Sequence, residues 1–311
     1  MSSPRIGLAL GAGGARGLAH VGVLRGLAKH HIQVDMITGS SIGALVGAMY
    51  AARQDIDWMI TRFREMLDSE AFAQSGINWV KAKMPGTEPG FLQWAAEYVA
   101  SKLVLNLSES RSGVVKNTRL LKLIDYLLPV KDFSELRLPF ACCAVDLQTG
   151  EDIILTQGDL VQAVAASSCI PGYLMPIEVD DRLLVDGGVS RPVPGNLARQ
   201  MGADFVIAVD IATQRFHPLE QNNIVSILGR TSEISATRLA QVQRNSWDFL
   251  LRPETGDTHW TEFEHLDKLV AAGEEVVEHD IRDLRRNIAA LTGVRGWLAK
   301  KVRRFKLYAG S

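Results

Sequence analysis

The sequence predicts an α/β fold in which helices cover a mainly parallel central sheet. Short apolar segments of strand length alternate with segments of helical periodicity through the first two thirds of the chain. Glycine-rich turns join strand to helix at two places, as tight βα connections require. The chain has 311 residues, 47% of them hydrophobic, which suffices for the core of one large domain or one domain with appendages.

Composition narrows the class of protein only a little. The net charge of −1 does not point to nucleic acid, and we expect no nucleic-acid partner. Cys142, Cys143 and Cys169 lack the spacing of a metal site, which favours reduced core thiols, no metal and a cytosolic chain. We expect no secretory signal, because the N-terminus has no charged segment leading into an apolar one. The uncharged stretches 36–52 and 161–177 are shorter than the ~20 apolar residues of a membrane span.

The first strand leads into a glycine-rich loop. Residues 6–10 are apolar throughout, 11–17 contain four glycines and Arg16, and 18–27 have helical periodicity. A dinucleotide-binding loop is one interpretation, but the third glycine falls one position late and Asp35 precedes the second strand instead of following it. The alternative is an oxyanion hole, in which unobstructed backbone N–H groups stabilise a developing negative charge and Arg16 adds charge or braces the loop.

The second strand leads into Gly39-Ser40-Ser41-Ile42-Gly43. Residues 32–38 resemble a buried strand and 44–52 a buried helix, so the order is strand, Gly-x-Ser-x-Gly, helix, which is the context of a nucleophile elbow. Gly39 and Gly43 would keep the tight turn free of colliding side chains. The turn would then lift the Ser41 hydroxyl to the positive end of the helix. The plainer alternative is a Gly/Ser-rich turn between two buried elements.

A third motif follows a short strand over 182–185. Asp186-Gly187-Gly188 places a carboxylate at a strand end with little steric cover, from which it could reach a neighbour. An ordinary Asp-Gly turn is the alternative. The other expected elements are a helix over 56–67 capped by Asp55, a helix over 118–128, a hairpin of 140–145 with 152–155, a helix from 159 to 166 and a strand over 205–209.

Two parts of the chain are harder to interpret. The apolar stretch 91–107, within 68–111, fits a core helix, or else a lid or acyl-pocket wall. After Ile211 we expect no further strands, but helices over 224–251 and 266–291. In the tail, six Lys or Arg residues between 295 and 306 alternate with apolar residues. This pattern fits a basic amphipathic helix on an anionic membrane surface, or a solvated basic tail.

Together these motifs resemble those of the patatin-like phospholipase family. Residues 13–17 match its Gly-Gly-x-Arg-Gly loop, 39–43 its serine elbow and 186–188 its Asp-Gly-Gly. Residues 166–171 match its Ala-Ser-x-Ala-x-Pro segment, with Cys169 in place of Ala. The resemblance covers about 5–212 and is strongest to the bacterial patatin-like and neuropathy-target-esterase-like group.

The resemblance implies a three-layer α/β/α fold and a serine–aspartate dyad. Residues 1–212 would form the catalytic domain, with 68–111 as a lid or pocket insertion, and 213–311 a helical extension with the basic tail. Ser41 would be the nucleophile and Asp186 its base, with no metal or cofactor. The oxyanion hole would comprise Gly13, Gly14, Ala15 and Arg16, and the motif-supporting glycines would be Gly39, Gly43, Gly187 and Gly188. None of the seven histidines follows a strand end after Asp186, where a triad would need one.

The implied activity is that of a serine acyl hydrolase of the phospholipase A or lysophospholipase type. Its partners would be a lipid acyl ester and, through 295–306, an anionic membrane surface, so the protein would be cytoplasmic or peripheral at the inner face of the membrane. The alternatives are a non-catalytic regulatory or scaffold protein with the same fold and a nucleotide-binding α/β protein. The sequence predicts no particular oligomeric state.

Overall fold

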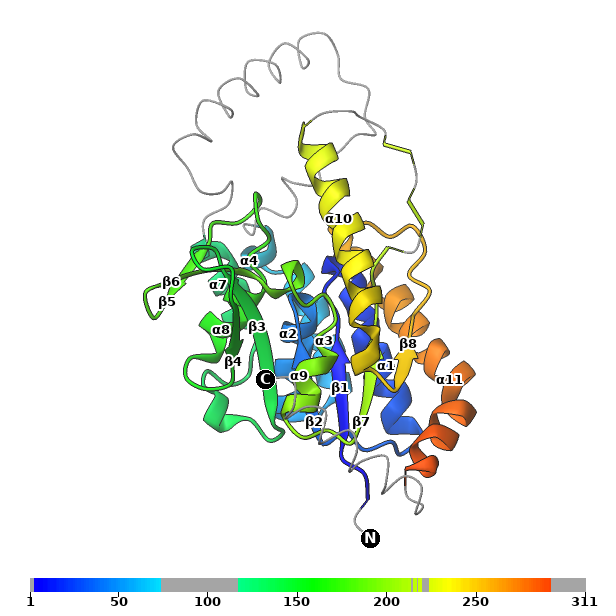
Figure 1. Cartoon of the computed structure of the whole chain (residues 1–311). Helices are drawn as coiled ribbons and strands as arrows, with labels where there is room; N and C mark the ends of the chain where they lie inside the picture. The colour runs from blue at the N-terminus through cyan, green and yellow to red at the C-terminus, as the bar shows by residue number, and fades with distance from the viewer. Residues whose placement is uncertain (1–2, 74–116, 214, 217, 220–223, 292–311) are drawn as a thin grey trace, which may run out of the picture.

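One eight-stranded sheet organises the protein (Figure 1). The computed structural model describes residues 3–73, 117–213, 215–216, 218–219 and 224–291. The strands are β1 (Ile6–Leu10), β2 (Met36–Gly39), β3 (Phe140–Asp146), β4 (Asp152–Leu155), β5 (Ile177–Val179), β6 (Arg182–Asp186), β7 (Phe205–Val209) and β8 (Phe249–Leu251). Their order is β5-β6-β3-β2-β1-β7-β8, and β4 also pairs with β3.

Helices cover both faces of this sheet. The helices are α1 (Ala19–Lys29), α2 (Ile42–Arg53), α3 (Ile56–Leu67), α4 (Glu70–Ala73), α7 (Asn117–Leu127), α8 (Leu160–Ser167), α9 (Gly195–Gln200), α10 (Ile224–Val242) and α11 (Leu266–Ala290). Short 3₁₀ turns are η1 (Gly14–Leu18), η2 (Phe133–Glu135), η3 (Gly187–Val189), η4 (Gln243–Ser246) and η5 (Phe263–His265). Strands β3, β2, β1, β7 and β8 pair in parallel, whereas β4, β5 and β6 pair antiparallel. The predicted fold class, a mainly parallel sheet in an α/β/α arrangement with a helical C-terminal region, is confirmed.

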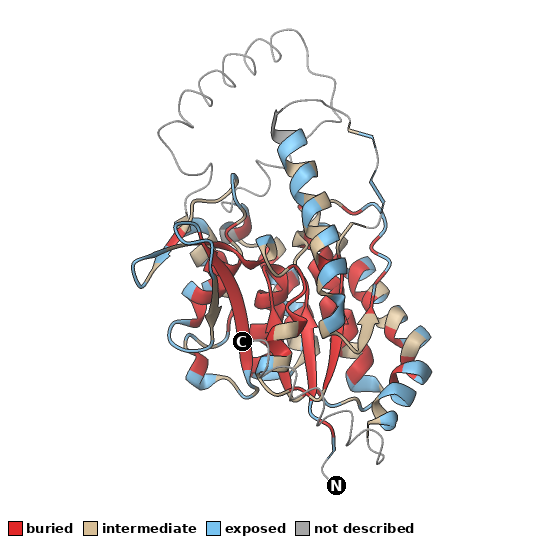
Figure 2. Ribbon diagram, viewed as in Figure 1, coloured by how far each residue is buried: buried red, intermediate tan, exposed pale blue. Residues whose placement is uncertain are grey.

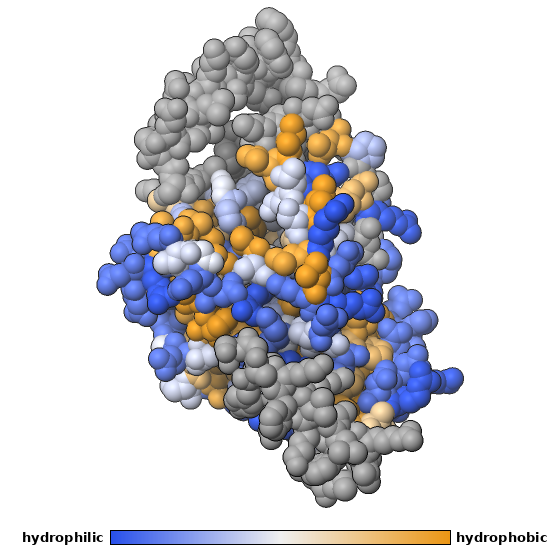
Figure 3. Space-filling model, in the orientation of Figure 1, coloured by the Kyte–Doolittle hydropathy of each residue, from blue (hydrophilic) through white to orange (hydrophobic). Residues whose placement is uncertain are grey.

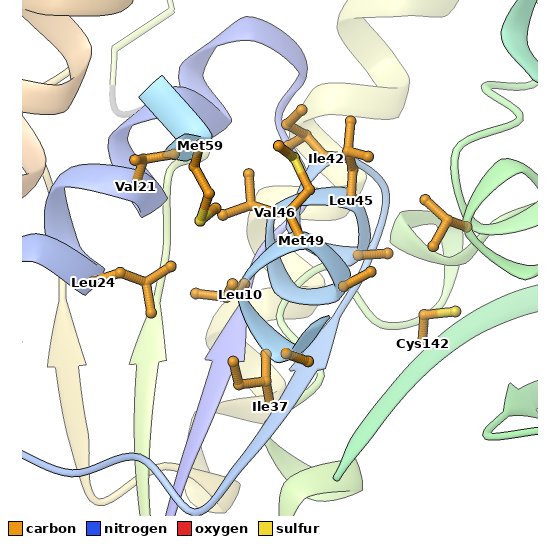
Figure 4. Close-up of a cluster of buried hydrophobic side chains, with 14 of the residues drawn as sticks. Leu10, Val21, Leu24, Ile37, Ile42, Leu45, Val46, Met49, Met59 and Cys142 are labelled. Atoms are coloured by element: carbon orange, nitrogen blue, oxygen red, sulfur yellow. The ribbon is translucent and has the colours of Figure 1, made fainter. Parts of the chain in front are cut away.

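The two faces of β1 carry side chains of different size. Leu8 and Leu10 lie in the large core that the sheet shares with α1, α2, α3, α8 and α11. Figure 4 shows part of this core, where Leu10 and Ile37 of the strands face Val46 and Met49 of α2. Ala9 lies in a smaller cluster on the opposite face, under α9. Small residues there let α9 approach closely, and the sheet is buried on both sides (Figure 2).

Helix α11 packs against α1 so closely that glycines are required at the contact. A Cβ at Gly22 would overlap the Val270 carbonyl, and one at Gly273 would overlap the Ala19 carbonyl. The ion pair between Arg25 and Glu274, with an N···O distance of 2.7 Å, adds to this contact. The 266–290 helix is therefore part of the same packed body as the first helix of the chain.

The expectation that strands end at Ile211 is wrong. Phe249–Leu251 forms β8, which pairs in parallel with β7 through Ala208 and Leu250. Three consecutive apolar residues are too few to show the alternation that identifies a strand, so the sequence pattern suggested a continuing helix. Of the expected 224–251 helix, 224–242 is helical, and the predicted helix over 266–291 is confirmed.

Most of the other expected elements are confirmed, and two expectations fall outside the described residues. Asp55 caps α3 through the Trp58 N–H at 2.9 Å, and Asp159 caps α8. The apolar stretch 91–107 and the basic tail 295–306 lie outside the described residues. The division of the chain at residue 212 remains a prediction, although β8 and α11 pack with the first 212 residues. In the described ranges, no helix combines the length and the hydropathy needed to cross a membrane.

Candidate active site

The pairing of β3 brings Ser41 and Asp186 together. Strand β4 occupies one edge of β3 over Cys142–Val145, so β2 and β6 must pair with the other edge, one after the other. β2 runs parallel to β3 and ends with Gly39 opposite Cys142. β6 runs antiparallel and ends with Asp186 opposite Ala144. The carboxyl ends of both strands therefore converge at Cys143, and the residues that follow them meet there.

Ser41 occupies a strained turn between β2 and α2. Its backbone has φ 56° and ψ −125°, which a residue other than glycine adopts rarely. A Cβ at Gly39 would overlap the Gly43 carbonyl, and a Cβ at Gly43 would overlap the carbonyl of Leu10. Both glycines are thus required by direct backbone contacts, as the Gly-x-Ser-x-Gly pattern indicates. The geometry is that of a nucleophile elbow.

The Ser41 hydroxyl is hydrogen-bonded to the Asp186 carboxylate. Ser41 Oγ donates to Asp186 Oδ2 at 2.6 Å, and both residues are only 6% exposed. The second carboxylate oxygen, Oδ1, accepts the N–H of Gly188 at 2.7 Å. Burial raises the pKa of Asp186 from 3.8 to about 6, because desolvation outweighs these two hydrogen bonds. The site therefore contains a carboxylate that is a stronger base than an exposed aspartate.

The end of α8 and the residues that follow it hold both members of this pair. The Ser41 N–H donates to the Ser167 carbonyl at 3.0 Å and lies 3.1 Å from the Ser167 hydroxyl. The Asp186 N–H donates to the Cys169 carbonyl at 3.0 Å. Sequence reasoning identified 166–171 as a motif but gave Ser167 no role. Its anchoring function could not be inferred locally, because it depends on contacts more than 100 residues away in sequence.

Gly187 and Ser40 fix the same region to β3. A Cβ at Gly187 would overlap the Cys143 carbonyl, so the turn after Asp186 lies directly against the strand. The Ser40 hydroxyl donates to the Arg191 carbonyl at 2.6 Å and lies 3.1 Å from the Cys143 sulfur. Burial raises the pKa of Cys143 to about 12, so this thiol stays protonated and acts as a packing group.

The glycine-rich loop lies beside both motifs. A Cβ at Gly17 would overlap the Ile42 side chain, next to Ser41, and a Cβ at Gly188 would come within 2.9 Å of the Ala12 Cβ. In the described part of the chain, the amides of Gly13 and Gly14 have no hydrogen-bond acceptor. A first-turn amide of a helix has no intrahelical acceptor, so these two groups are suited to bind an oxyanion.

The structure differs from the expectation for Ala15. Its N–H donates to the Trp260 carbonyl at 2.7 Å and is therefore not available for an oxyanion. Trp260 lies in the region where the sequence showed no motif, so its role could not be foreseen from the loop alone. Of the three predicted amide donors, Gly13 and Gly14 remain candidates.

Arg16 braces the loop rather than pointing a free charge into it. Its side chain is 8% exposed, and its Nε donates to the Gly13 carbonyl at 3.2 Å. Its terminal nitrogens bond to Thr213 Oγ1 and, at 3.4 Å, to Glu233 Oε1 of α10. Burial lowers the pKa of Arg16, and the negative charge of Glu233 opposes this effect. These contacts favour a role for Arg16 in bracing the loop over a role in adding positive charge to it.

Comparison with known proteins shows the family of the chain. The family model described as Patatin-like phospholipase matches residues 8–198. The chain belongs to the patatin-like phospholipase family.

An uncharacterized NTE family protein of Mycobacterium tuberculosis is 32% identical over 212 residues, 68% of this chain and 50% of that protein. Patatin-like phospholipase domain-containing protein 7 of Rattus norvegicus is 29% identical over 297 residues, 86% of this chain and 20% of that protein. VipD from Legionella pneumophila, a solved structure, has a TM-score of 0.47 at 15% identity and covers 89% of this chain and 66% of its own.

This patatin-like chain spans half or less of the length of these curated relatives. The matched region contains Ser41, Asp186 and the whole glycine-rich loop. Glu233 and Trp260, which contact that loop, lie beyond the match. The C-terminal region thus contributes contacts to the candidate site that the family motifs do not include.

The positions of His20 and Asp35 bear on the two interpretations of the glycine-rich loop, a dinucleotide-binding loop and an oxyanion hole. His20 Nε2 donates to the Gly11 carbonyl at 2.8 Å, and burial lowers the pKa of His20 to about 4, so the ring is neutral and supports the loop. The Asp35 carboxylate accepts the Ile6 N–H at 2.6 Å, at the end of β1 opposite the glycine-rich loop. That position leaves Asp35 far along the strand from where a ribose would bind.

A cluster of possible metal ligands lies at η5, which packs against η1. Ligand atoms of Glu262, Glu264 and His265 lie within 4.8 Å of one another. Two of these residues are exposed, and exposed acidic groups of this kind are common without an ion. We assign no metal to this cluster.

Proposed function

We propose that this protein is a serine acyl hydrolase that cleaves acyl esters of lipids through Ser41 and Asp186. The observation that carries the proposal is the 2.6 Å hydrogen bond from Ser41 Oγ to Asp186 Oδ2 at the end of a strained elbow. A nucleophile needs an adjacent base and a tight turn that presents its side chain, and both are supplied by elements that β3 brings together.

The first half-reaction forms an acyl-enzyme. Ser41 Oγ attacks the ester carbonyl while its proton passes to Asp186 Oδ2, and the carbonyl oxygen becomes an oxyanion. The N–H groups of Gly13 and Gly14 stabilise that charge. When the intermediate collapses, the ester C–O bond breaks and Asp186 returns the proton to the leaving alcohol.

The second half-reaction regenerates the enzyme. Water attacks the acyl group on Ser41, and Asp186 takes one proton from the water. The second tetrahedral intermediate collapses to a carboxylic acid, and the proton on Asp186 returns to Ser41 Oγ. The raised pKa of Asp186, about 6, suits this exchange because the carboxyl is ionised at neutral pH yet accepts a proton more readily than an ordinary aspartate.

Exposed apolar side chains support a lipid substrate. Val189, directly after the Asp-Gly-Gly motif, is 49% exposed, and Ile227 and Leu228 near the start of α10 are also exposed. Figure 3 shows hydrophobic surface among hydrophilic residues on the face of the molecule turned to the viewer. Exposed apolar side chains of this kind fit contact with acyl chains better than contact with a nucleotide.

A covalent serine probe tests the proposal. A fluorophosphonate should label the protein at Ser41, and Ser41→Ala should abolish labelling while leaving the fold intact by circular dichroism. Hydrolysis of a short-chain p-nitrophenyl ester and of a lysophospholipid should be measured on the same preparations. Labelling without turnover on any ester would favour the regulatory alternative, and equal labelling of Ser41→Ala would exclude Ser41 as the nucleophile.

A further inference from the structure

Three side chains connect helix α10 to the glycine-rich loop. Arg16 Nη1 donates to Thr213 Oγ1, and the Thr213 hydroxyl donates to Glu233 Oε1 at 2.9 Å. Arg16 Nη2 lies 3.4 Å from the same Glu233 oxygen. Glu233 Oε1 thus accepts hydrogen bonds from the Arg16 guanidinium and from the Thr213 hydroxyl. The same hydroxyl accepts a hydrogen bond from Arg16. Among the described residues, Glu233 is also 3.8 Å from Arg230 on its own helix.

The other end of Arg16 sets the orientation of one peptide unit. Arg16 Nε donates to the Gly13 carbonyl at 3.2 Å. That carbonyl belongs to the same planar unit as the Gly14 N–H, and in a trans peptide the two groups point to opposite sides. Fixing the Gly13 carbonyl toward Arg16 therefore turns the Gly14 N–H away from it. Gly14 has φ 59°. Because glycine adopts many backbone conformations, contacts with other residues must fix this one.

The neighbouring peptide units are held by other contacts. The Ala12 N–H donates to the Pro192 carbonyl at 2.8 Å, and the Ala15 N–H donates to the Trp260 carbonyl at 2.7 Å. The carbonyl of Gly11 accepts from His20 Nε2. Between these fixed points, the Gly13 carbonyl begins the 3₁₀ turn η1, and the Arg16 side chain adds a hydrogen bond to it.

We propose that Glu233 is a positioning residue for the oxyanion hole, acting through Arg16 and the Gly13 carbonyl on the Gly14 N–H. This inference rests on the proposed hydrolase function. Helix α10 also approaches the dyad, because it leads into η4, where Gln243 Nε2 donates to the Ser190 carbonyl at 2.7 Å. The helix is thus linked through η4 to the loop after Asp186, and through Glu233 to the glycine-rich loop. A displacement of α10 would change the oxyanion donor without touching the nucleophile.

The charge of Glu233 has a second effect on this network. A guanidinium that is 8% exposed requires a compensating partner, and Glu233 is the strongest favourable charge near Arg16. The side chain of Glu233 is 37% exposed, so its own removal creates no cavity in the core. Loss of the carboxylate should therefore disturb Arg16 more than it disturbs the fold.

The test compares two Glu233 variants on a soluble p-nitrophenyl ester. Glu233→Ala removes the acceptor and should lower kcat about tenfold with KM nearly unchanged, less than the ~10²-fold loss on deleting an oxyanion donor. Glu233→Gln keeps an acceptor oxygen for Thr213 and Arg16 but not the negative charge, and should recover part of kcat. The matched control, Glu275→Ala on the exposed side of α11, should leave kcat and the thermal midpoint unchanged.

A double-mutant cycle separates positioning from a general structural role. In an Arg16→Ala background, Glu233→Ala should cause no further loss of kcat, because the two residues act in series. Thr213→Val and Thr213→Ser provide a second route if the alanine variants do not fold, and the valine variant should lose kcat while the serine variant retains it. Unchanged kcat in Glu233→Ala, a loss confined to KM, or full additivity with Arg16→Ala would each overturn the inference.

The control for the underlying function is Ser41→Ala in the same assay. If Ser41→Ala keeps its activity, the proposed hydrolase mechanism fails. If Ser41→Ala is inactive while every Glu233 and Thr213 variant matches the wild type, only the positioning role of Glu233 fails.

Discussion

In the proposed mechanism, Ser41 and Asp186 act as one unit that is joined by a 2.6 Å hydrogen bond. Ser41→Ala and Asp186→Asn should each reduce kcat/KM for a soluble ester by about 10³-fold or more, and the double variant should lose no more than the worse single one. Steady-state kinetics on the three purified variants measures this. Substantial activity in Asp186→Asn would show that another group serves as the base.

The buried carboxylate also sets a pH dependence. Since the pKa of Asp186 is raised to about 6 and the base must be ionised, kcat/KM should fall as pH drops through about 6 and reach a plateau above it. An ordinary exposed aspartate, with a pKa of ~3.9, would keep the rate level down to about pH 5. A profile between pH 4.5 and 8.5 on a neutral ester distinguishes the two cases, with circular dichroism as the check on folding.

Two adjacent glycines of the loop should respond differently to an added Cβ. At Gly14, φ is 59° and a Cβ would overlap the Trp260 carbonyl, so Gly14→Ala should lower both turnover and thermal stability. At Gly13 the nearest atom to a Cβ would be the flexible Ile211 Cδ1 at 2.8 Å, so Gly13→Ala should be milder in both respects. Equal effects would contradict the assigned backbone geometry.

At the scale of the elements, the contact between α1 and α11 depends on close approach of two helix backbones. A Cβ at Gly273 would overlap the Ala19 carbonyl, so Gly273→Ala must separate the helices and should destabilise the protein by about 1–3 kcal/mol or more. Urea denaturation with an unchanged m-value would measure this loss.

Gly229 on α10 offers the matched control. Its added Cβ would meet only the Tyr173 hydroxyl, at 3.7 Å, in ordinary contact. Gly229→Ala should therefore stabilise the folded state by about 0.5–1 kcal/mol, because alanine favours helix over glycine. A comparable loss of stability in both variants would mean that the helices are sensitive to any added methyl group and not to the contact at Gly273.

At the scale of the whole molecule, the proposed lipid substrate would have to be reached at a membrane surface. The tail from 295 to 306, which lies outside the described residues, carries six basic and several apolar residues. Each basic residue near an anionic membrane contributes about 1 kcal/mol, which would suffice for reversible binding. We expect salt-sensitive binding to anionic liposomes that is lost on truncation after Gly293, while hydrolysis of a soluble ester continues. Co-sedimentation at two salt concentrations measures it, and equal binding of both forms would exclude the tail.

The sequence by itself determined the features that depend on short-range sterics. Gly39 is required because a Cβ there would overlap the Gly43 carbonyl within the same turn, and the uniformly apolar β1 and β7 must be buried in any fold. Such constraints act within one turn or one strand, so the residue pattern identifies them.

Only the tertiary structure decided which groups meet. Strand β3 aligns the ends of β2 and β6 and so brings Ser41 to Asp186, 145 residues away. The Trp260 carbonyl takes up the Ala15 N–H, and Glu233 reaches Arg16 from α10. These pairings depend on how the whole sheet and its helices pack. A single hydrogen-bonding group can accept many partners, and the global arrangement of the chain selects one of them.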